Sequence, residues 1–177
     1  FRPAGPDEAV ECWKIALKRT NGPTCLVMSR QGLTLHKKLD DDDRDSLRRL
    51  GAYRVREPRR DPEVTVLATG SEVDLATAAA DAVAGECAVR VVSVPSRELL
   101  AAAPKEERAA LFGENVPVVA VEAGSRCGWE RFTGGDPDRV LGIDRFGESG
   151  RGEEVADHLG LTVDRLVEIL RSAKGEG

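Results

Sequence analysis

A short run of apolar and β-branched residues, Val64 to Ala68, constrains the fold of this chain more than any other feature. The run is followed at once by Thr69, Gly70 and Ser71, where a turn leads into a helical pattern. A strand that is apolar on both faces is typical of a parallel sheet covered by helices, because neither face meets water. Gly70 permits the sharp turn, and Ser71 is suited to cap the helix that begins at Glu72.

The same order of apolar strand and turn recurs three more times along the chain. The repeats are Val89–Pro95, Val116–Gly124 and Val140–Gly147. Helical patterns separate them, and Gly51–Glu57 alternates polar and apolar residues as an edge strand does. This alternation predicts an α/β fold of three layers, α/β/α, with a mostly parallel sheet of about five strands that carries one edge strand.

The start of the chain predicts a separate piece of structure. A helix is expected from about Asp7, and Thr24–Met28 is expected to form a short strand after Asn21-Gly22-Pro23 stops that helix. Trp13 falls on the apolar face of the helix, so we expect it in the core. A single helix and a single strand cannot bury both their faces, so this opening is interpreted as a partial βα segment of another domain. Much later in the chain, after Val116–Gly124, the stretch Gly128–Phe132 is expected to form a short helix.

These patterns predict the domain organisation. Residues 1–35 are expected to be the end of one domain, residues 36–50 a solvated linker with four consecutive Asp, and residues 51–177 a complete second domain. His36 falls in this linker and is expected to be an exposed bystander. The chain begins with Phe1 rather than Met, so we expect it to be a fragment of a longer protein.

Composition excludes several classes of function. The 177 residues carry 26 basic and 31 acidic side chains, and a net charge of −5 argues against a general nucleic-acid surface. No apolar run approaches the roughly 20 residues that cross a bilayer. The four cysteines lack metal spacing and there are only two His, so we expect reduced and buried thiols, a cytoplasmic protein and no zinc site.

Three carboxylates would come together where parallel strands end. Glu72, Glu122 and Asp144 each follow a predicted strand, and in open α/β sheets ligands bind at that edge, which also includes Gly70. These side chains could do acid–base or metal chemistry, or they could cap helices, pair with Arg126 or Arg145, or serve a subunit contact. The structural interpretation is favoured, because no nucleophile motif accompanies them.

Arg30 is the other candidate site residue. It lies in Ser29-Arg30-Gln31, directly after the predicted strand Thr24–Met28, where a guanidinium is suited to grip a phosphate with two hydrogen bonds. Spacing alone favours an ordinary surface arginine.

Several motifs, taken in order, resemble the C-terminal third of the transketolase family. They are Arg2-Pro3-Ala4, Glu8, Trp13, Ser29-Arg30-Gln31, Ala68–Val73, Val91–Ser96, Glu98-Leu99, Val121–Ser125, Gly128-Trp129, Gly142–Asp144 and Phe146-Gly147. The resemblance implies that residues 1–35 end the pyrimidine-binding middle domain and that residues 51–177 form the C-terminal domain. One departure is the segment Glu148–Gly152, where relatives continue with small residues and a proline.

The resemblance also implies a function for the parent enzyme. Transketolases are homodimers that use thiamine diphosphate and Mg²⁺ to move a two-carbon ketol unit between sugar phosphates. In the family, the arginine of the Ser-Arg-Gln element contacts the sugar phosphate, which makes Arg30 the expected substrate-binding residue. No catalytic, cofactor-binding or metal-binding residue is expected on this chain, so the fragment alone is expected to be an inactive scaffold that supports the dimer.

Two alternatives stay open at this point. The chain could be the last domain of a related thiamine-diphosphate enzyme, such as deoxyxylulose phosphate synthase or the beta subunit of a 2-oxo acid dehydrogenase. It could also be a stand-alone regulatory module that binds a small ligand at the edge formed by Gly70, Glu122 and Asp144.

Overall fold

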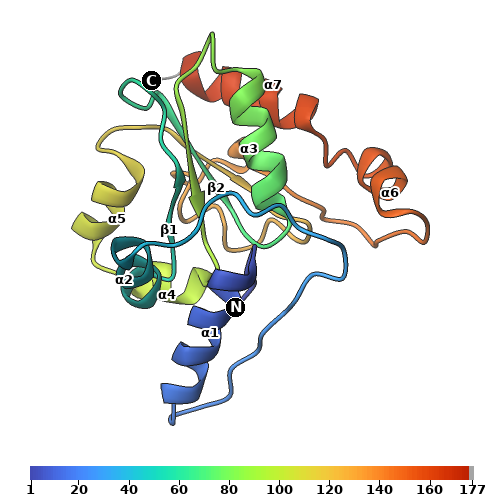
Figure 1. Ribbon diagram of the computed structural model, residues 1–177. Helices are drawn as coiled ribbons and strands as arrows, with labels where there is room; N and C mark the ends of the chain where they lie inside the picture. The colour runs from blue at the N-terminus through green and yellow to red at the C-terminus, as the bar shows by residue number, and fades with distance from the viewer. Residues whose placement is uncertain (176–177) are drawn as a thin grey trace.

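A five-stranded sheet forms the centre of the molecule in the computed structural model, which describes residues 1–175 (Figure 1). The strand order is β1-β3-β2-β4-β5, with β1 antiparallel to β3 and the other pairs parallel. The strands are β1 (Tyr53–Arg56), β2 (Val64–Ala68), β3 (Val89–Ser93), β4 (Val118–Val121) and β5 (Val140–Leu141). The α/β fold predicted from the sequence, with a mostly parallel sheet of about five strands, is therefore confirmed, and the predicted edge strand is the antiparallel β1.

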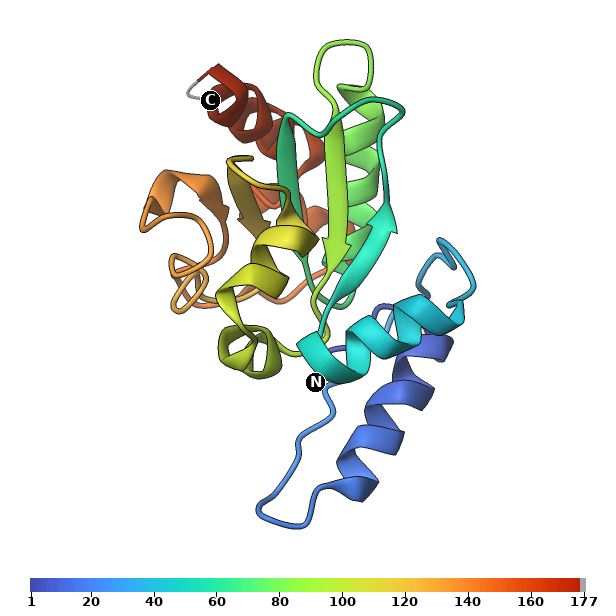
Figure 2. The same cartoon turned by 90° about the vertical axis from the view of Figure 1, so that its left-hand side faces the viewer.

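Helices cover both faces of this sheet and extend beyond it. They are α1 (Pro6–Lys18), α2 (Asp41–Leu50), α3 (Glu72–Ala82), α4 (Arg97–Ala102), α5 (Lys105–Phe112), the 3₁₀ helix η1 (Pro137–Arg139), α6 (Gly152–His158) and α7 (Val163–Gly175). Figures 1 and 2 show α3 and α7 on one side of the sheet and α4 and α5 on the other. Within residues 1–175, none of these helices has the length and hydrophobicity needed to span a bilayer.

The pleat of the central strands divides the core into two layers. On β2, Val64, Val66 and Ala68 pack among α3 and α7, whereas Leu67 faces the opposite layer with α4 and α5. All five residues of this strand are buried, as a strand covered on both faces requires. Thr65 is accommodated there because its hydroxyl donates a hydrogen bond to the carbonyl of Phe112, 2.6 Å away.

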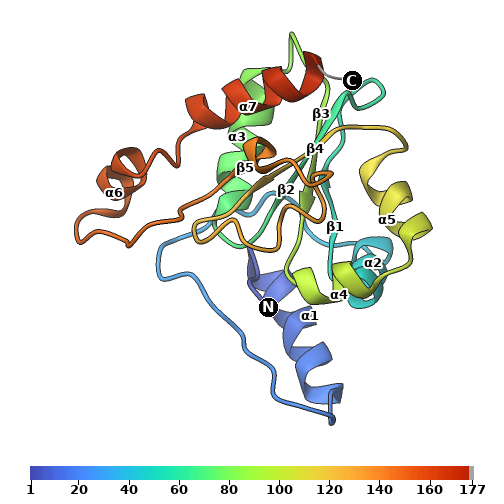
Figure 3. The same cartoon turned by 180° about the vertical axis from the view of Figure 1, so that it is seen from behind.

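Helix α1 does not bury the face expected from its sequence pattern. Cys12 is fully buried, but the side chain of Trp13 is 53% exposed and that of Leu17 is 77% exposed, so the prediction of a core Trp13 is wrong. Figure 3 shows the reason, because α1 projects from the body and only one side of it meets other elements.

The predicted strand Thr24–Met28 is also absent. The segment is extended, but its pairing is limited to Phe1, whose ammonium donates to the Cys25 carbonyl and whose carbonyl accepts from the Val27 amide. A strand needs a neighbour of several residues to form a ladder, and residues 1–175 provide none here. Val27 and Met28 are each 56% exposed as a result.

Much of the expected linker 36–50 is helical. Asp40 and Asp43 form a reciprocal capping box at the start of α2, and Leu47 and Leu50 are buried on its inner side. The helix ends at Gly51, whose φ of 69° is left-handed and whose missing Cβ would lie 2.6 Å from the Ser96 carbonyl oxygen. The run of aspartates is therefore the charged start of an amphipathic helix.

The segment Gly128–Phe132 and strand β5 also differ from what the sequence patterns predict. Gly128–Phe132 forms consecutive turns instead of a helix, with Trp129 fully buried between the sheet layer and Phe132. Strand β5 has two residues, because the chain leaves the sheet at Gly142, where a Cβ would lie 3.1 Å from the Gly124 carbonyl oxygen.

Candidate functional site

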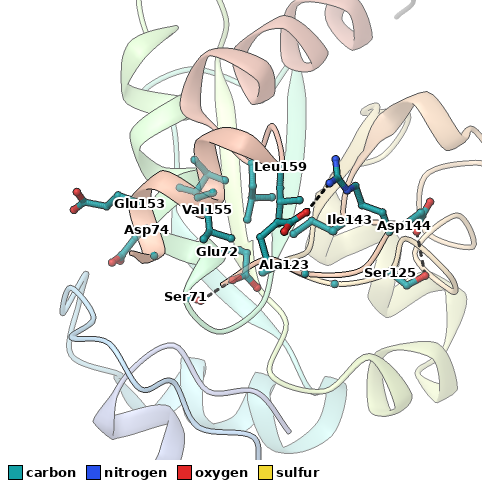
Figure 4. Close-up of a pocket in the computed structure, with 18 of the residues that line it drawn as sticks. Ser71, Glu72, Asp74, Ala123, Ser125, Ile143, Asp144, Glu153, Val155 and Leu159 are labelled. Atoms are coloured by element: carbon teal, nitrogen blue, oxygen red, sulfur yellow. Dashed lines mark hydrogen bonds and ion pairs between the residues drawn. The ribbon is translucent and has the colours of Figure 1, made fainter. Parts of the chain in front are cut away.

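Two of the three predicted carboxylates meet at the carboxyl ends of the parallel strands. Glu72 begins α3 directly after β2, and Glu122 follows β4. Both side chains reach the guanidinium of Arg2, a residue that sequence analysis did not propose for this site. Figure 4 shows Glu72 beside Ser71 and Ala123 at this edge.

Arg2 bridges the two glutamates. Its Nη2 atom lies 2.9 Å from Oε2 of Glu72, and its Nη1 atom contacts Oε1 of Glu122. Burial raises the pKa of Glu72, which is 3% exposed, and the neighbouring Glu122 carboxylate acts in the same direction, while Arg2 lowers it. Trp129 donates its indole N–H to the other oxygen of Glu122 at 3.1 Å.

The backbone of the first residues is also bound to the strand ends. The Arg2 amide donates to the Pro95 carbonyl at 2.8 Å, and the Arg2 carbonyl accepts from the Gly70 amide at 3.1 Å. Gly70 has a left-handed φ of 57°, and this conformation turns the chain from β2 into α3. The edge at which an open α/β sheet binds ligands is therefore occupied by the chain's own beginning.

Another buried carboxylate fixes α1 to the sheet. Glu8, which is 3% exposed, accepts hydrogen bonds from the Ala4 amide at 2.6 Å, the Tyr53 hydroxyl at 2.8 Å and the Ser93 hydroxyl at 2.7 Å. Burial raises the pKa of Glu8, although these three hydrogen bonds oppose the shift. Burial and the Glu8 charge also raise the pKa of Tyr53. Sequence analysis named Glu8 only as part of a motif, because nothing in its spacing indicates burial.

Asp144 does not join the other two carboxylates. It accepts hydrogen bonds from the Arg126 amide at 2.9 Å and the Ser125 hydroxyl at 3.1 Å, and its other oxygen lies 2.5 Å from Nε of Arg126. The Arg126 amide and guanidinium lower the pKa of Asp144. This is one of the structural pairings expected from the sequence. The expected Ser71 cap is absent, because its hydroxyl instead donates to Glu72 at 2.6 Å.

A groove of about 1560 Å³ opens beside this edge (Figure 4). It lies between α3, α6 and the loops that follow β4 and β5. Apolar side chains that line the groove include Leu75, Ile143, Val155 and Leu159. Acidic side chains that line it include Asp74, Asp144, Glu148 and Glu153. The Phe146 side chain at its margin is 95% exposed.

The structure leaves Arg30 at the surface, apart from the strand-end carboxylates. Within residues 1–175 its guanidinium makes no hydrogen bond or ion pair, so its phosphate-binding role stays a prediction. The adjacent Gln31 lines the groove. The expectation that His36 is exposed is wrong, because its side chain is only 16% exposed and its Nε2 atom lies 2.5 Å from Oδ1 of Asp74. Of the thiols, Cys12 and Cys87 are buried, whereas Cys25 and Cys127 are exposed, contrary to the expectation of buried cysteines.

The fold and the carboxyl-terminal edge of its sheet together define a class of protein. It is an α/β domain whose strand ends bind the N-terminal segment of the same chain. Residues 51–162 match the family model described as "Transketolase-like TK C-terminal domain". The chain therefore belongs to the transketolase family.

Individual relatives agree with this assignment. A transketolase of Treponema pallidum is 44% identical over 170 residues, which are 96% of this chain and 25% of the relative. The transketolase structure from Leishmania mexicana superposes with a TM-score of 0.85 at 34% identity, covering 99% of this chain and 25% of that one. A Pichia stipitis transketolase in complex with sedoheptulose-7-phosphate gives a TM-score of 0.86 at 26% identity, with the same coverage. The chain thus spans about a quarter of the length of these relatives.

The residues described here do not fit thiamine diphosphate or its Mg²⁺ ion. The strand-end edge is lined by carboxylates, which repel a diphosphate, and Arg2, the cation that reaches Glu72 and Glu122, is already engaged by both of them. Among residues 1–175, no group of three or more His, Cys, Asp or Glu side chains is arranged to hold a metal ion.

Replacing Arg2 by methionine is expected to destabilise the fold. The substitution leaves Glu72 and Glu122 facing each other without a counter-charge, at a cost of about 3 kcal/mol, the low end for breaking a buried ion pair, because Arg2 is 30% exposed. Urea unfolding measures the change. The control Arg30→Met alters an exposed arginine and should change the free energy of unfolding by less than about 0.5 kcal/mol. Equal effects of the two substitutions would contradict the role of Arg2.

Glu8 is expected to make stability depend on pH. Because its folded-state pKa is raised above the ordinary 4.5, the folded chain binds more protons than the unfolded chain between those two values. The contribution of Glu8 to the free energy of unfolding therefore falls as pH rises from 4.5 through the folded-state pKa. Urea unfolding across this pH window should show that the free energy of unfolding of the wild type falls, as pH rises, relative to that of the Glu8→Gln variant. A difference that stays constant or shifts the other way refutes the assignment.

Proposed function

We propose that this chain is the C-terminal part of a transketolase that works as a homodimer in the cytoplasm. The parent enzyme transfers a two-carbon ketol unit between ketose and aldose phosphates in the pentose phosphate pathway. It uses thiamine diphosphate and Mg²⁺ that are held by other parts of the enzyme. The proposal is supported by the family match and by relatives about four times as long as this chain.

By itself the chain is a scaffold without activity. The observation that carries this proposal is the bridge of Arg2 to Glu72 and Glu122, which engages both carboxylates at the edge where a ligand would bind. The same bridge argues against a stand-alone regulatory module that binds a small ligand at Gly70 and Glu122. The relatives described above are transketolases, which argues against the related thiamine-diphosphate enzymes.

The domain division is part of the proposal. Residues 1–35 belong to the middle domain, residues 36–50 connect the domains, and residues 51–177 form the C-terminal domain. The exposed apolar side chains of Trp13, Leu17 and Met28 suit a surface that packs against the rest of a transketolase, whether on the same chain or on a separate N-terminal subunit.

Arg30 binds the phosphate group of the sugar substrate in the assembled enzyme. Its guanidinium is exposed and carries five N–H donors that no residue among 1–175 engages, so it is available for a bidentate contact with phosphate. The existence of a related transketolase in complex with sedoheptulose-7-phosphate agrees with a phosphorylated sugar as ligand.

The 177-residue chain is expected to show no turnover when it is supplied with thiamine diphosphate, Mg²⁺ and a ketose phosphate–aldose phosphate pair. The physical reason is that the carboxylate-lined strand ends do not suit a diphosphate, and that no group of three or more His, Cys, Asp or Glu side chains among residues 1–175 is arranged to hold the metal. The measurement is a coupled assay of product formation, with a complete transketolase as the positive control. Turnover well above that of a heat-denatured sample would show that the scaffold proposal is wrong.

Substituting Arg30 is expected to weaken binding of phosphorylated substrates selectively. In a complete transketolase that contains this chain, Arg30→Leu should raise KM for a sugar phosphate by about tenfold or more, because charged hydrogen bonds are lost. KM for an unphosphorylated donor such as hydroxypyruvate should not change. Arg59→Leu, which removes another exposed arginine, is the matched control. If both KM values stay the same in Arg30→Leu, Arg30 has no role in phosphate binding.

A further inference from the structure

We propose that Asp74 of the C-terminal domain is a positioning residue for the Arg30 loop, defined here as residues 28–33. Asp74 lies in the first turn of α3, and the Arg30 loop is about 40 positions earlier in the sequence. Its Oδ2 atom accepts a hydrogen bond from the Thr34 amide at 3.2 Å, and its Oδ1 atom lies 2.5 Å from Nε2 of His36. The inference rests on the proposed role of Arg30 in phosphate binding.

The Arg30 loop has no internal attachment of its own. Within the described part of the chain, residues 28–33 form no hydrogen bond, and the loop extends from one anchor to another. The first anchor is the Val27 amide, which donates to the Phe1 carbonyl at 2.8 Å, and the second is the Thr34 amide on Asp74. The position of Arg30 therefore depends on these two points, because six unattached residues have many conformations between fixed ends.

Asp74 is well placed to act as the second anchor. Its two carboxylate oxygens serve two separate donors, so one side chain fixes both Thr34 and His36. Its negative charge is favourable in the first turn of a helix, where backbone N–H groups are unpaired. The helix is itself rooted in the core by Val73 and Ala76, which are 1% and 0% exposed.

The chain after His36 is held by different groups. Lys37 pairs with Asp43 at 2.6 Å and donates to the Arg54 carbonyl at 3.3 Å, and the Leu39 amide donates to Asp7 at 3.1 Å. These contacts attach residues 37–39 to α1, α2 and β1, and they would persist if Asp74 were replaced. The loss of Asp74 should therefore release residues 28–36 and leave the rest of the fold in place.

Asp74 and the Arg30 loop also share a wall of the groove. Gln31 and Asp74 both line it, and Figure 4 shows Asp74 on the α3 side, beyond Glu72. A sugar phosphate bound by Arg30 would thus be oriented relative to the C-terminal domain through Asp74. This gives the domain an indirect part in substrate affinity, although Asp74 itself does not touch the substrate.

The first test is hydrogen–deuterium exchange on the 177-residue chain carrying Asp74→Ala. The amide of Thr34, which donates to Asp74, should exchange about fivefold faster than in the wild type, which is the effect of losing one ordinary hydrogen bond. Asp81→Ala is the matched control, because Asp81 lies on the same helix and forms an ion pair with Arg56 at 2.9 Å, away from the loop. Unchanged exchange in Asp74→Ala, or equal acceleration in Asp81→Ala, would overturn the inference.

The second test measures kinetics in a complete transketolase that contains this chain. Asp74→Ala should raise KM for a sugar phosphate about fivefold, without a change in kcat or in KM for hydroxypyruvate, and Asp74→Asn should have a smaller effect because its amide oxygen can still accept one hydrogen bond. A purely structural loss would change kcat and both KM values together. If Arg30→Leu shows its selective effect and Asp74→Ala does not, the inference fails and the proposed function stands. If Arg30→Leu shows no selective effect, both fail.

Discussion

The ion pairs of Arg2 with Glu72 and Glu122 are the interaction on which the arrangement of this chain depends. Parallel strands end with unpaired backbone groups at one edge of the sheet, and here that edge also carries two buried carboxylates. Two such charges are stable together only when a counter-charge accompanies them. The guanidinium of Arg2 supplies it, and in doing so brings the first residues of the chain onto the ends of β2, β3 and β4.

The remaining contacts of the N-terminal segment extend from this anchor. Glu8 inserts between Tyr53 and Ser93 and fixes the start of α1, while Glu11 pairs with Arg48 at 2.8 Å and joins α1 to α2. Asp74 then holds the returning chain at Thr34. Polar contacts with geometric requirements, rather than a large apolar interface, therefore orient residues 1–36 on the α/β domain, and the apolar side chains of Trp13 and Leu17 stay exposed.

Sequence patterns predicted the elements that are stabilised locally or by the sheet itself. Val64–Ala68 and Val89–Ser93 are mostly apolar and are buried along their whole length because both their faces are covered, and this signal does not depend on other parts of the chain. The wrong predictions for Thr24–Met28 and for the polar run at Asp41 have a common cause. Thr24–Met28 has strand composition but no neighbouring strand, and the polar run that begins at Asp41 forms a helix because Leu47 finds a buried site beside Leu39 and Tyr53. Periodicity cannot report whether a partner surface is present.

The residues of the candidate site also divide into those that local sequence patterns predict and those that only the folded chain reveals. The sequence alone determined that Glu72, Glu122 and Asp144 follow strands, because parallel strands bring their carboxyl ends to one edge, and its motif order indicated the transketolase family. Only the tertiary structure decided which charges meet there. Arg2 reaches Glu72 across 70 positions of sequence and Asp144 pairs with Arg126 instead, because long-range ion pairs are selected by the packing geometry of the folded chain, which no local pattern of residues contains.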